Sequence, residues 1–544
     1  MRKLFAIILV FLMVFSGLAA GEDSTASTDL ADRRERTEKT DTTLNMPQGE
    51  AYSKLPIGVI TFRSDAFRQN AACGTVPVGI DRMLILWERT YPLESTEYLC
   101  GGFEWSAQPL IVKWTKQIRE QTVFAEGYEP PVAMKETMMT NAVGLTRFFD
   151  LMTGEETREH LEAGGLMSGG MVLHPSGIPY MSVCQTGRST KDPGTGLRQY
   201  NMYDLSEFPM VSSLQPDIVA GPEEQDGFVS APLIDRTTDR MIAPGTNGYL
   251  YHIALNCELD YVDGTLDIHP EVTTSKPVSM TDRTTGYIAP VSVLDSFIYC
   301  GDTAGVLRCV DSGTMKSIWE KDLEDAILSA IPLEIREDRP VLYAANTLTN
   351  RENGKAAVIC CDAMTGEELW RQEFSVEYSE KYLPVRSAGF VASPVIGREG
   401  LGQLVFFTIT GMARETRDRL GLSGEPQSAL IAMDKETGEI HWVFPMKSYC
   451  FSSPVAVYDD NGTGIIIQCT SKGVVRMLDG RTGDVIREIQ LAGSIDASPA
   501  VYGDTMVVIS SDDGNEYIYG ILLAGKETDA PFALEPFVPF EEGI

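Results

Sequence analysis

Short apolar runs, separated by turn-forming residues, follow one another from Ile57 to about residue 523. Seven of these runs begin with a small residue followed closely by proline, at Pro109, Pro232, Pro290, Pro332, Pro394, Pro454 and Pro499. An eighth segment of this kind lacks the proline and lies at Gly170–Met171. Successive segments are 42 to 62 residues apart. A repeat of this length, built from strand-like runs, is typical of propellers and solenoids.

A second motif recurs within the repeats, in which an apolar run ends in aspartate and a Thr-Gly turn follows. Clear copies begin at Asp150, Asp362, Asp434 and Asp479, and a looser copy begins at Asp311. The position eight residues after the aspartate holds Trp319, Trp370 and Trp442 in three copies and Arg158 and Arg487 in two others. We expect the aspartate to accept a backbone N–H of its own turn and the glycine to adopt a positive φ. The tryptophan is expected to pack against a neighbouring blade.

The eight segments predict an all-β fold, an eight-bladed β-propeller of four-stranded antiparallel blades. The last unit begins at Ala497 and contains only about three strands. We expect the N-terminal strand around Arg82 to Thr90 to complete this blade, with Trp87 in the tryptophan position. A ring closed by both chain ends has no open sheet edge.

The ends of the chain differ in composition from the repeats. Residues 1–21 contain a basic start, an apolar run from Leu4 to Phe15 and small residues, which predicts a signal peptide and export from the cell. Residues 22–56 are polar and charged, and we expect a disordered leader. The propeller is expected over residues 57–523, and an acidic tail over 524–544. No later apolar run is long enough to predict a transmembrane segment in the mature chain.

The charge of the chain limits its partners. Its formal net charge is −32, and loss of residues 1–21, which include Arg2 and Lys3, would make it −34. A chain this acidic repels nucleic acid and anionic lipid, so neither is an expected partner.

The repeat motif resembles that of the PQQ-like repeat propellers, whose blades carry the pattern Asp-x-x-Thr-Gly-x-x-x-Trp. The resemblance covers roughly residues 57–523 and implies the propeller fold. That superfamily includes quinone-dependent dehydrogenases and also non-catalytic propellers that bind partner proteins, so the fold alone does not select a function. The chain is similar to the secreted, non-catalytic members.

Several residues are candidates for a cofactor or metal site, and their positions in the repeat favour a structural role for each. The resemblance implies that dehydrogenases hold quinone against an adjacent-cysteine disulfide, but Cys360 and Cys361 fall in the third strand of a blade, where their side chains point to opposite faces. No segment supplies the acidic set for a calcium ion, and none of the five histidines has metal-ligand spacing. We therefore predict no catalytic residue, no cofactor and no metal.

Three long insertions stand out, at residues 185–199, 346–355 and 411–427. Each falls between the second and third strands of its blade, so all three should emerge on one face of the ring. Together they contain eight bases and five acids, against the strongly acidic background. The candidate partner-binding residues are Arg188, Lys191, Arg198, Arg351, Lys355, Arg414, Arg417 and Arg419.

These observations favour an exported non-catalytic scaffold that binds a protein or other ligand, with a protein or an anionic glycan as the partner. Tolerated surface insertions without a binding role remain the simpler reading of the three loops. The alternative function is a quinone-dependent dehydrogenase.

Overall fold

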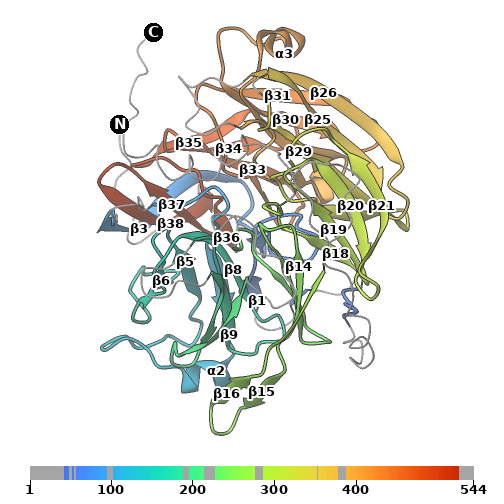
Figure 1. The fold of residues 1–544 in the computed structure, drawn as a ribbon. Coiled ribbons are helices and arrows are strands. Elements are labelled where there is room, and N and C mark those ends of the chain that lie inside the picture. Colours follow the sequence, from blue (N-terminus) through green and yellow to red (C-terminus); the bar gives the residue numbers. More distant parts are fainter. Residues whose placement is uncertain are drawn as a thin grey trace, which may run out of the picture.

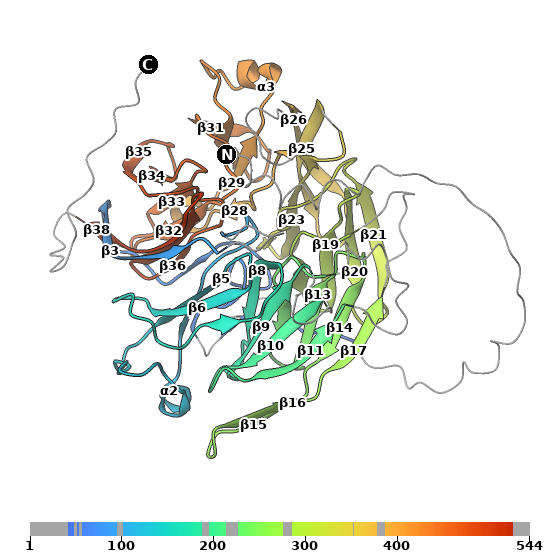
Figure 2. The ribbon, with the colours of Figure 1, turned by 60° about the vertical axis from the view of Figure 1, so that its left-hand side comes forward.

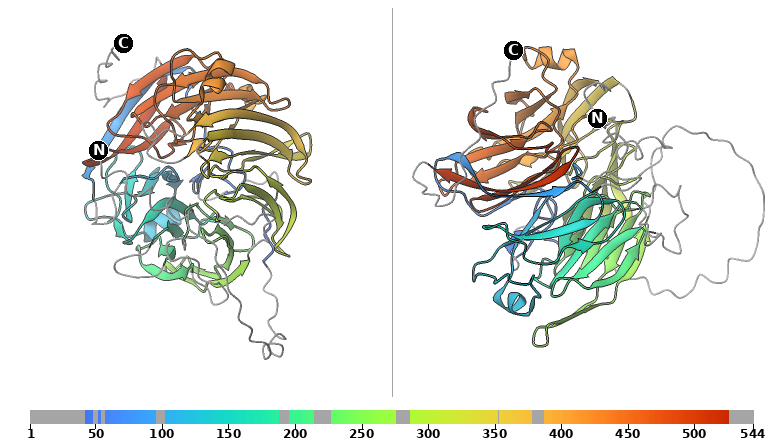
Figure 3. Two further views of the ribbon diagram at one scale, coloured as in Figure 1. Left: turned by 45° about the horizontal axis from the view of Figure 1, so that its top comes forward. Right: turned by 90° about the vertical axis from the view of Figure 1, so that its left-hand side faces the viewer.

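The computed structural model describes residues 42–47, 52–53, 57–94, 102–187, 195–213, 227–275, 286–351, 353–377 and 387–525. Eight mainly antiparallel sheets follow one another around a ring, as the repeat spacing predicts (Figure 1 and Figure 3, left). In the described part of the chain, no helix is long and apolar enough to cross a membrane. The eight-bladed propeller is therefore confirmed.

The first four blades lie between residues 57 and 322. Blade 1 contains β1 (Ile57–Val59), β4 (Leu110–Lys113), β5 (Glu136–Thr140), β6 (Leu145–Asp150) and β7 (Leu161–Glu162), and blade 2 contains β8 (Met167–Leu173), β9 (Tyr180–Gln185), β10 (Gly196–Asn201) and β11 (Glu207–Ser212). Blade 3 contains β12 (Leu233–Asp235), β13 (Arg240–Pro244), β14 (Leu250–Ala254) and β17 (Glu271–Ser275), and blade 4 contains β18 (Ser292–Leu294), β19 (Phe297–Gly301), β20 (Val306–Asp311) and β21 (Lys316–Asp322).

The next three blades continue the ring. Blade 5 contains β22 (Leu333–Arg336), β23 (Arg339–Ala345), β25 (Asn353–Asp362) and β26 (Glu368–Glu377). Blade 6 contains β24 (Thr347–Leu348), β27 (Ala388–Gly389), β28 (Val395–Ile396), β29 (Leu404–Thr410), β30 (Ser428–Asp434) and β31 (Ile440–Met446). Blade 7 contains β32 (Val455–Tyr458), β33 (Gly464–Cys469), β34 (Val474–Asp479) and β35 (Val485–Gln490).

Blade 8 joins the two ends of the described chain. Its β36 (Ala500–Tyr502), β37 (Thr505–Ser511) and β38 (Asn515–Gly525) come from the C-terminal side, and β2 (Ala72–Cys73) and β3 (Ile80–Pro92) come from the N-terminal side. Strand β3 pairs antiparallel with β38 along most of its length, and Figure 3 shows the two side by side. The predicted closure by the N-terminal strand is confirmed.

The Asp-Thr-Gly turns have the predicted geometry. Asp362 Oδ1 accepts the backbone N–H groups of Met364 and Thr365, both at 2.9 Å. Gly366 has a φ of +71°, a value that side-chain-bearing residues adopt only with strain. The equivalent aspartates Asp150, Asp434 and Asp479 accept the same pair of N–H groups in their own turns.

Each tryptophan in the repeat position binds the turn of the following blade. Trp370 of blade 5 donates its indole N–H to the Lys435 carbonyl of blade 6 at 2.8 Å, and its ring lies against Gly438. Trp87, Trp319 and Trp442 make the equivalent bond to Leu151, Ala363 and Gly480. Arg158 donates to the corresponding carbonyl of Met202 in blade 2. In these five blades the side chain at this position therefore joins one blade to the next. Arg487, which occupies the same position in blade 7, is exposed and makes no such bond among the described contacts.

Two parts of the fold differ from the simple repeat. Blade 3 carries an extra hairpin between its third and fourth strands, formed by β15 (Cys257–Asp260) and β16 (Thr265–Ile268), which projects from the ring in Figure 2. Residues 42–47 belong to the stretch expected to be disordered, yet Leu44 and Met46 are buried against blades 3 and 4. This is a correction to the expected leader, and its reason is the burial of two apolar side chains.

We expect Gly438→Ala to lower the apparent melting temperature more than Gly79→Ala. Both glycines have a similar φ, +71° and +68°, so both substitutions introduce about 1 to 2 kcal/mol of backbone strain. At Gly438 the new Cβ would also lie 2.7 Å from the Trp370 ring, whereas nothing lies within 4 Å at Gly79. Thermal unfolding of both variants measures the difference, and equal shifts would contradict the proposed fastening role of Trp370.

Candidate functional site: the channel and the loop face

The innermost strands of the blades surround a central channel, and residues 57–76 of the chain lie inside it. We call these residues the channel segment. They contact the innermost strand region of every blade in order: Gly58 with Val112, Ile60 with Leu173, Thr61 with Pro232, Ala66 with Val293, Phe67 with Leu333, Gln69 with Ile396, Asn70 with Ala456 and Ala71 with Val501. The channel segment thus hydrogen-bonds to the inner edges of the innermost strands, which would otherwise face the channel.

Two buried arginines of the channel segment bind the proline segments of several blades. Arg63 donates to the carbonyls of Pro454 at 2.6 Å and Pro394 at 2.8 Å. Arg68 donates to the carbonyls of Ala231 at 2.8 Å and Val291 at 2.9 Å. Both side chains are almost completely buried. One guanidinium group therefore bridges carbonyls from separate blades, which a smaller donor would not reach.

Burial changes the ionisation of these groups without discharging the arginines. Burial lowers the pKa of Arg63 to about 9 and that of Arg68 to about 10, so both remain charged at neutral pH. Burial also raises the pKa of Asp65 above its usual range, and the Arg398 guanidinium, 3.9 Å away, opposes that rise. Hydrogen bonds to several carbonyls compensate the buried positive charges.

A second ring of hydrogen bonds joins neighbouring proline segments. The backbone N–H groups of Ala330, Ser393 and Ser453 each donate to the serine hydroxyl of the following blade, at Ser393, Ser453 and Ser498. The backbone N–H of Ser498 reaches the Ala107 carbonyl of blade 1. On the other half of the ring, the hydroxyls of Ser106, Ser168, Ser230 and Ser292 donate to carbonyls of the following blade. The serines in or beside these segments thus have a shared role, which is to join neighbouring blades.

Little space remains inside the ring on the side of the proline segments. A cavity of about 10 Å³ is lined by Phe62, Trp105 and residues of the proline segments, including Ser230, Pro290 and Ser453. This volume is close to the minimum for a single water molecule. Around this cavity, the described residues are closely packed.

The described residues do not fit the quinone that the resemblance raises as the alternative. Cys360 and Cys361 are free and buried in β25, the predicted third strand. Cys360 packs among blade 6 residues such as Phe407, whereas Cys361 packs among blade 4 residues such as Tyr299. The two thiols therefore face opposite sides of one sheet, and the channel segment fills the space beside the innermost strands.

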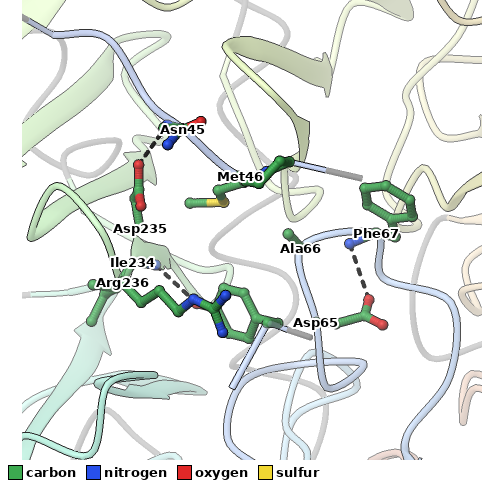
Figure 4. A pocket seen from close by; sticks show the side chains of 10 residues that line it. Asn45, Met46, Asp65, Ala66, Phe67, Ile234, Asp235 and Arg236 are labelled. Carbon is green, nitrogen blue, oxygen red and sulfur yellow. Dashed lines mark hydrogen bonds between the residues drawn. The ribbon is translucent and has the colours of Figure 1, made fainter. Parts of the chain in front are cut away.

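A separate cavity of about 150 Å³ lies between residues 45–47 with Tyr52, the channel segment and the first hairpin of blade 3. In Figure 4, Asp235 and Arg236 lie on one side and Asp65 and Phe67 on the other. The Asn45 N–H donates to Asp235 Oδ2, and the Ile234 N–H donates to the Tyr52 hydroxyl. Its volume is below the usual range of about 300 to 1,000 Å³ for small-molecule sites. It could hold only a small ligand.

The three insertions lie at the predicted step between second and third strands, namely β9 to β10, β23 to β25 and β29 to β30. Arg188 and Lys191 lie outside the described residues. Arg198, expected in the first loop, instead lies within β10, where it is buried and bonded to Gln185 and Glu207. It is buried inside the blade and bonded to residues of its own sheet, so this candidate contact residue is corrected.

The insertions of blades 5 and 6 come together, and we call residues 346–355 and 411–427 the 5–6 loop cluster. Helix α3 (Arg414–Arg419) lies against β26, where Arg419 donates to the Glu373 carbonyl and stacks over the Phe374 ring. Lys355 binds the Glu373 carboxylate at 2.7 Å. Figure 1 shows α3 standing above β26 and β31. Blade 2 lies three blades away from blade 5, so its insertion does not join this cluster.

Most of the cluster's bases already have acidic neighbours. Arg351 lies 3.3 Å from Asp325 and 3.5 Å from Glu324, and Arg414 lies 3.6 Å from Asp418. Arg417 donates to the Met412 carbonyl. The Arg414 side chain is 84% exposed, against 66% for Lys355 and 43% for Arg351. Surface ion pairs of this kind are weak and can exchange for a partner's acids.

The comparisons with known proteins agree with this architecture. Residues 303–518 match the family described as outer membrane protein assembly factor BamB. No curated protein matches the sequence. A quinohemoprotein alcohol dehydrogenase from Comamonas testosteroni is similar in structure, with a TM-score of 0.54 and 12% identity, covering 87% of this chain and 81% of that one.

Two further solved structures are similar. For quinohemoprotein alcohol dehydrogenase ADHIIG from Pseudomonas putida HK5 the TM-score is 0.57 at 12% identity, covering 92% of this chain and 85% of that one. For BamB from Moraxella catarrhalis the TM-score is 0.44 at 15% identity, covering 77% and 98%. At such low identities, the likeness to the two dehydrogenase structures shows the fold alone.

We expect Arg68→Gln to destabilise the protein by about 3 to 5 kcal/mol, because it leaves buried carbonyls from several blades without a donor. Arg398→Gln is the control, since that side chain is 53% exposed, lies 3.9 Å from the Asp65 carboxylate and donates one hydrogen bond to the Gln69 side chain. Its loss should change the free energy of unfolding by less than about 1 kcal/mol. Urea denaturation compares the two. Similar midpoints would show that Arg68 does not hold the ring together.

Proposed function

We propose that this eight-bladed propeller of PQQ-like repeats is an exported, non-catalytic scaffold that binds a protein partner through the 5–6 loop cluster. The observation that carries the proposal is the filled channel. Residues 57–76 contact all eight blades there, and a cavity beside the proline segments measures about 10 Å³. A substrate and a cofactor of quinone size would require displacement of the protein's own chain.

The 5–6 loop cluster has features that suit a binding surface. It is anchored on a rigid blade by the contact of α3 with β26, and Leu420 and Leu422 pack against the core of blades 5 and 6. It exposes Arg414 in a chain with a net charge of −32. Arginine is favoured in protein interfaces because its planar head donates several hydrogen bonds. A partner with an acidic surface fits this chemistry.

Export is part of the proposal and rests on the sequence of residues 1–21, which lie outside the described residues. The match of residues 303–518 to the family of an outer membrane protein assembly factor supports both an extracytoplasmic location and a protein partner.

We expect the triple variant Arg351→Ser, Lys355→Ser and Arg414→Ser to lose most partner recovery in pull-downs from the native cells. The matched control replaces Lys113, Lys316 and Arg481, which are exposed at the turns of the opposite face. Partner recovery by the wild type should also fall as salt rises, because the contact is electrostatic. Equal recovery by both triple variants would contradict the proposed surface, as would recovery insensitive to salt.

We further expect no dye-linked oxidation of alcohols or sugars after incubation of the folded protein with quinone and calcium. The reason is the lack of fit at Cys360, Cys361 and the channel segment described above. Visible absorbance after desalting measures quinone retention, and a known quinoprotein provides the positive control. Turnover that disappears in Cys360→Ser or Cys361→Ser would establish the dehydrogenase alternative instead.

A further inference from the structure

The junction between blades 2 and 3 lacks the contact that fastens several other blades. No tryptophan or arginine occupies the repeat position in β11, and blade 3 has the β15–β16 hairpin in place of the usual Asp-Thr-Gly turn. Three other side chains meet at this junction, on the same face as those turns. They are His174, which follows β8, Asp239, which lies between β12 and β13, and Cys257, which begins β15.

The three side chains already converge on one point. His174 Nε2 lies 2.9 Å from Asp239 Oδ1, and the Cys257 backbone N–H donates to Asp239 Oδ2 at 2.7 Å. The ligand atoms of all three residues lie within 4.8 Å of one another. In a tetrahedral zinc site, bond lengths of about 2.0 to 2.3 Å place neighbouring ligand atoms about 3.3 to 3.7 Å apart. Small side-chain rotations would therefore bring the three atoms to zinc-binding distances.

We propose that His174, Asp239 and Cys257 form a Zn²⁺ site that links blade 2 to the base of the blade 3 hairpin. An imidazole nitrogen, a carboxylate oxygen and a thiolate sulfur are the ligand types that zinc uses in proteins. The thiolate disfavours Ca²⁺ and Mg²⁺, which take oxygen ligands. Three protein ligands leave one coordination position for water.

The surroundings of His174 suit a metal ligand. Its side chain is buried, which limits the orientations of the ring. The Ser176 backbone N–H donates to Nδ1 at 3.2 Å, and the Ser176 hydroxyl lies 3.0 Å from the same atom. Zinc binding through Nε2 therefore requires the backbone N–H to release Nδ1 and the hydroxyl to accept the Nδ1–H. Binding requires the Cys257 thiol to lose its proton, and the imidazole must carry its remaining proton on Nδ1 when Nε2 binds the ion. With Asp239 and the thiolate, the bound ion forms an electrically neutral site.

The test uses the full mature chain kept reduced, with cobalt(II) as a spectroscopic substitute for zinc. We expect one equivalent of Co²⁺ to give a thiolate-to-cobalt charge-transfer band that Zn²⁺ removes and Ca²⁺ does not. Cys257→Ser should abolish the band, and Asp239→Asn and His174→Gln should each weaken zinc binding at least tenfold in calorimetric titration. No band with folded wild-type protein, or a band that persists in Cys257→Ser, would overturn the proposal.

Matched controls separate this site from adventitious binding. Cys73→Ser removes another half-buried thiol, and His441→Gln removes a histidine that lies 3.7 Å from Asp434 without a described cysteine beside it. Both should bind zinc as the wild type does. A measurement without any variant is alkylation of Cys257, followed by mass spectrometry, and zinc should slow it at least tenfold. An unchanged rate of alkylation would also refute the site.

Discussion

The hydrogen bonding between the channel segment and the innermost strands is the interaction on which the rest of this structure depends. In a propeller, the innermost strand of each blade has one edge without a strand partner, and its buried N–H and C=O groups need partners. Residues 57–76 provide them in all eight blades, and Arg63 and Arg68 bind carbonyls that the backbone does not reach. The ring and its interior are therefore one hydrogen-bonded unit. The ring closes in blade 8, where β2 and β3 join the C-terminal strands.

This constraint bears directly on function. Residues 57–76 occupy the part of the channel beside the innermost strands, so any ligand of the ring must bind elsewhere or beside this segment. Differences between blades are then found in the loops at the edge of the ring. The lengths of these loops differ between the two faces. The turns between third and fourth strands are covered by Trp87, Trp319, Trp370 and Trp442, so a longer turn would break the contact between blades. The step between second and third strands carries no such tryptophan contact in the described blades, and long insertions are found there.

The sequence predicts what is repeated and local. Proline segments, aspartate turns and tryptophans at a constant spacing indicated the eight blades, the closing strand with Trp87 and the opposed thiols of Cys360 and Cys361. The channel segment could not be predicted, because its partners are backbone carbonyls spread over the whole chain, and Arg63 and Arg68 resemble ordinary surface residues. Arg198 was misplaced because the length of an insertion does not show where the next strand begins.

The zinc proposal illustrates the same limit. His174 lies 65 residues before Asp239, so motif spacing could not join them, and only the packing of blade 2 on blade 3 does so. Elsewhere, Trp370 or Arg158 spans the gap between blades with a hydrogen bond to a carbonyl. Between blades 2 and 3, the β15–β16 hairpin stands where other blades have the turn that accepts this hydrogen bond. Strand β11 also has no tryptophan or arginine to donate it, so these two blades must be joined by another contact. A bound cation with one ligand from blade 2 and two from blade 3 would meet that need, and it would also hold the base of a hairpin whose tip exposes Tyr261 and Val262.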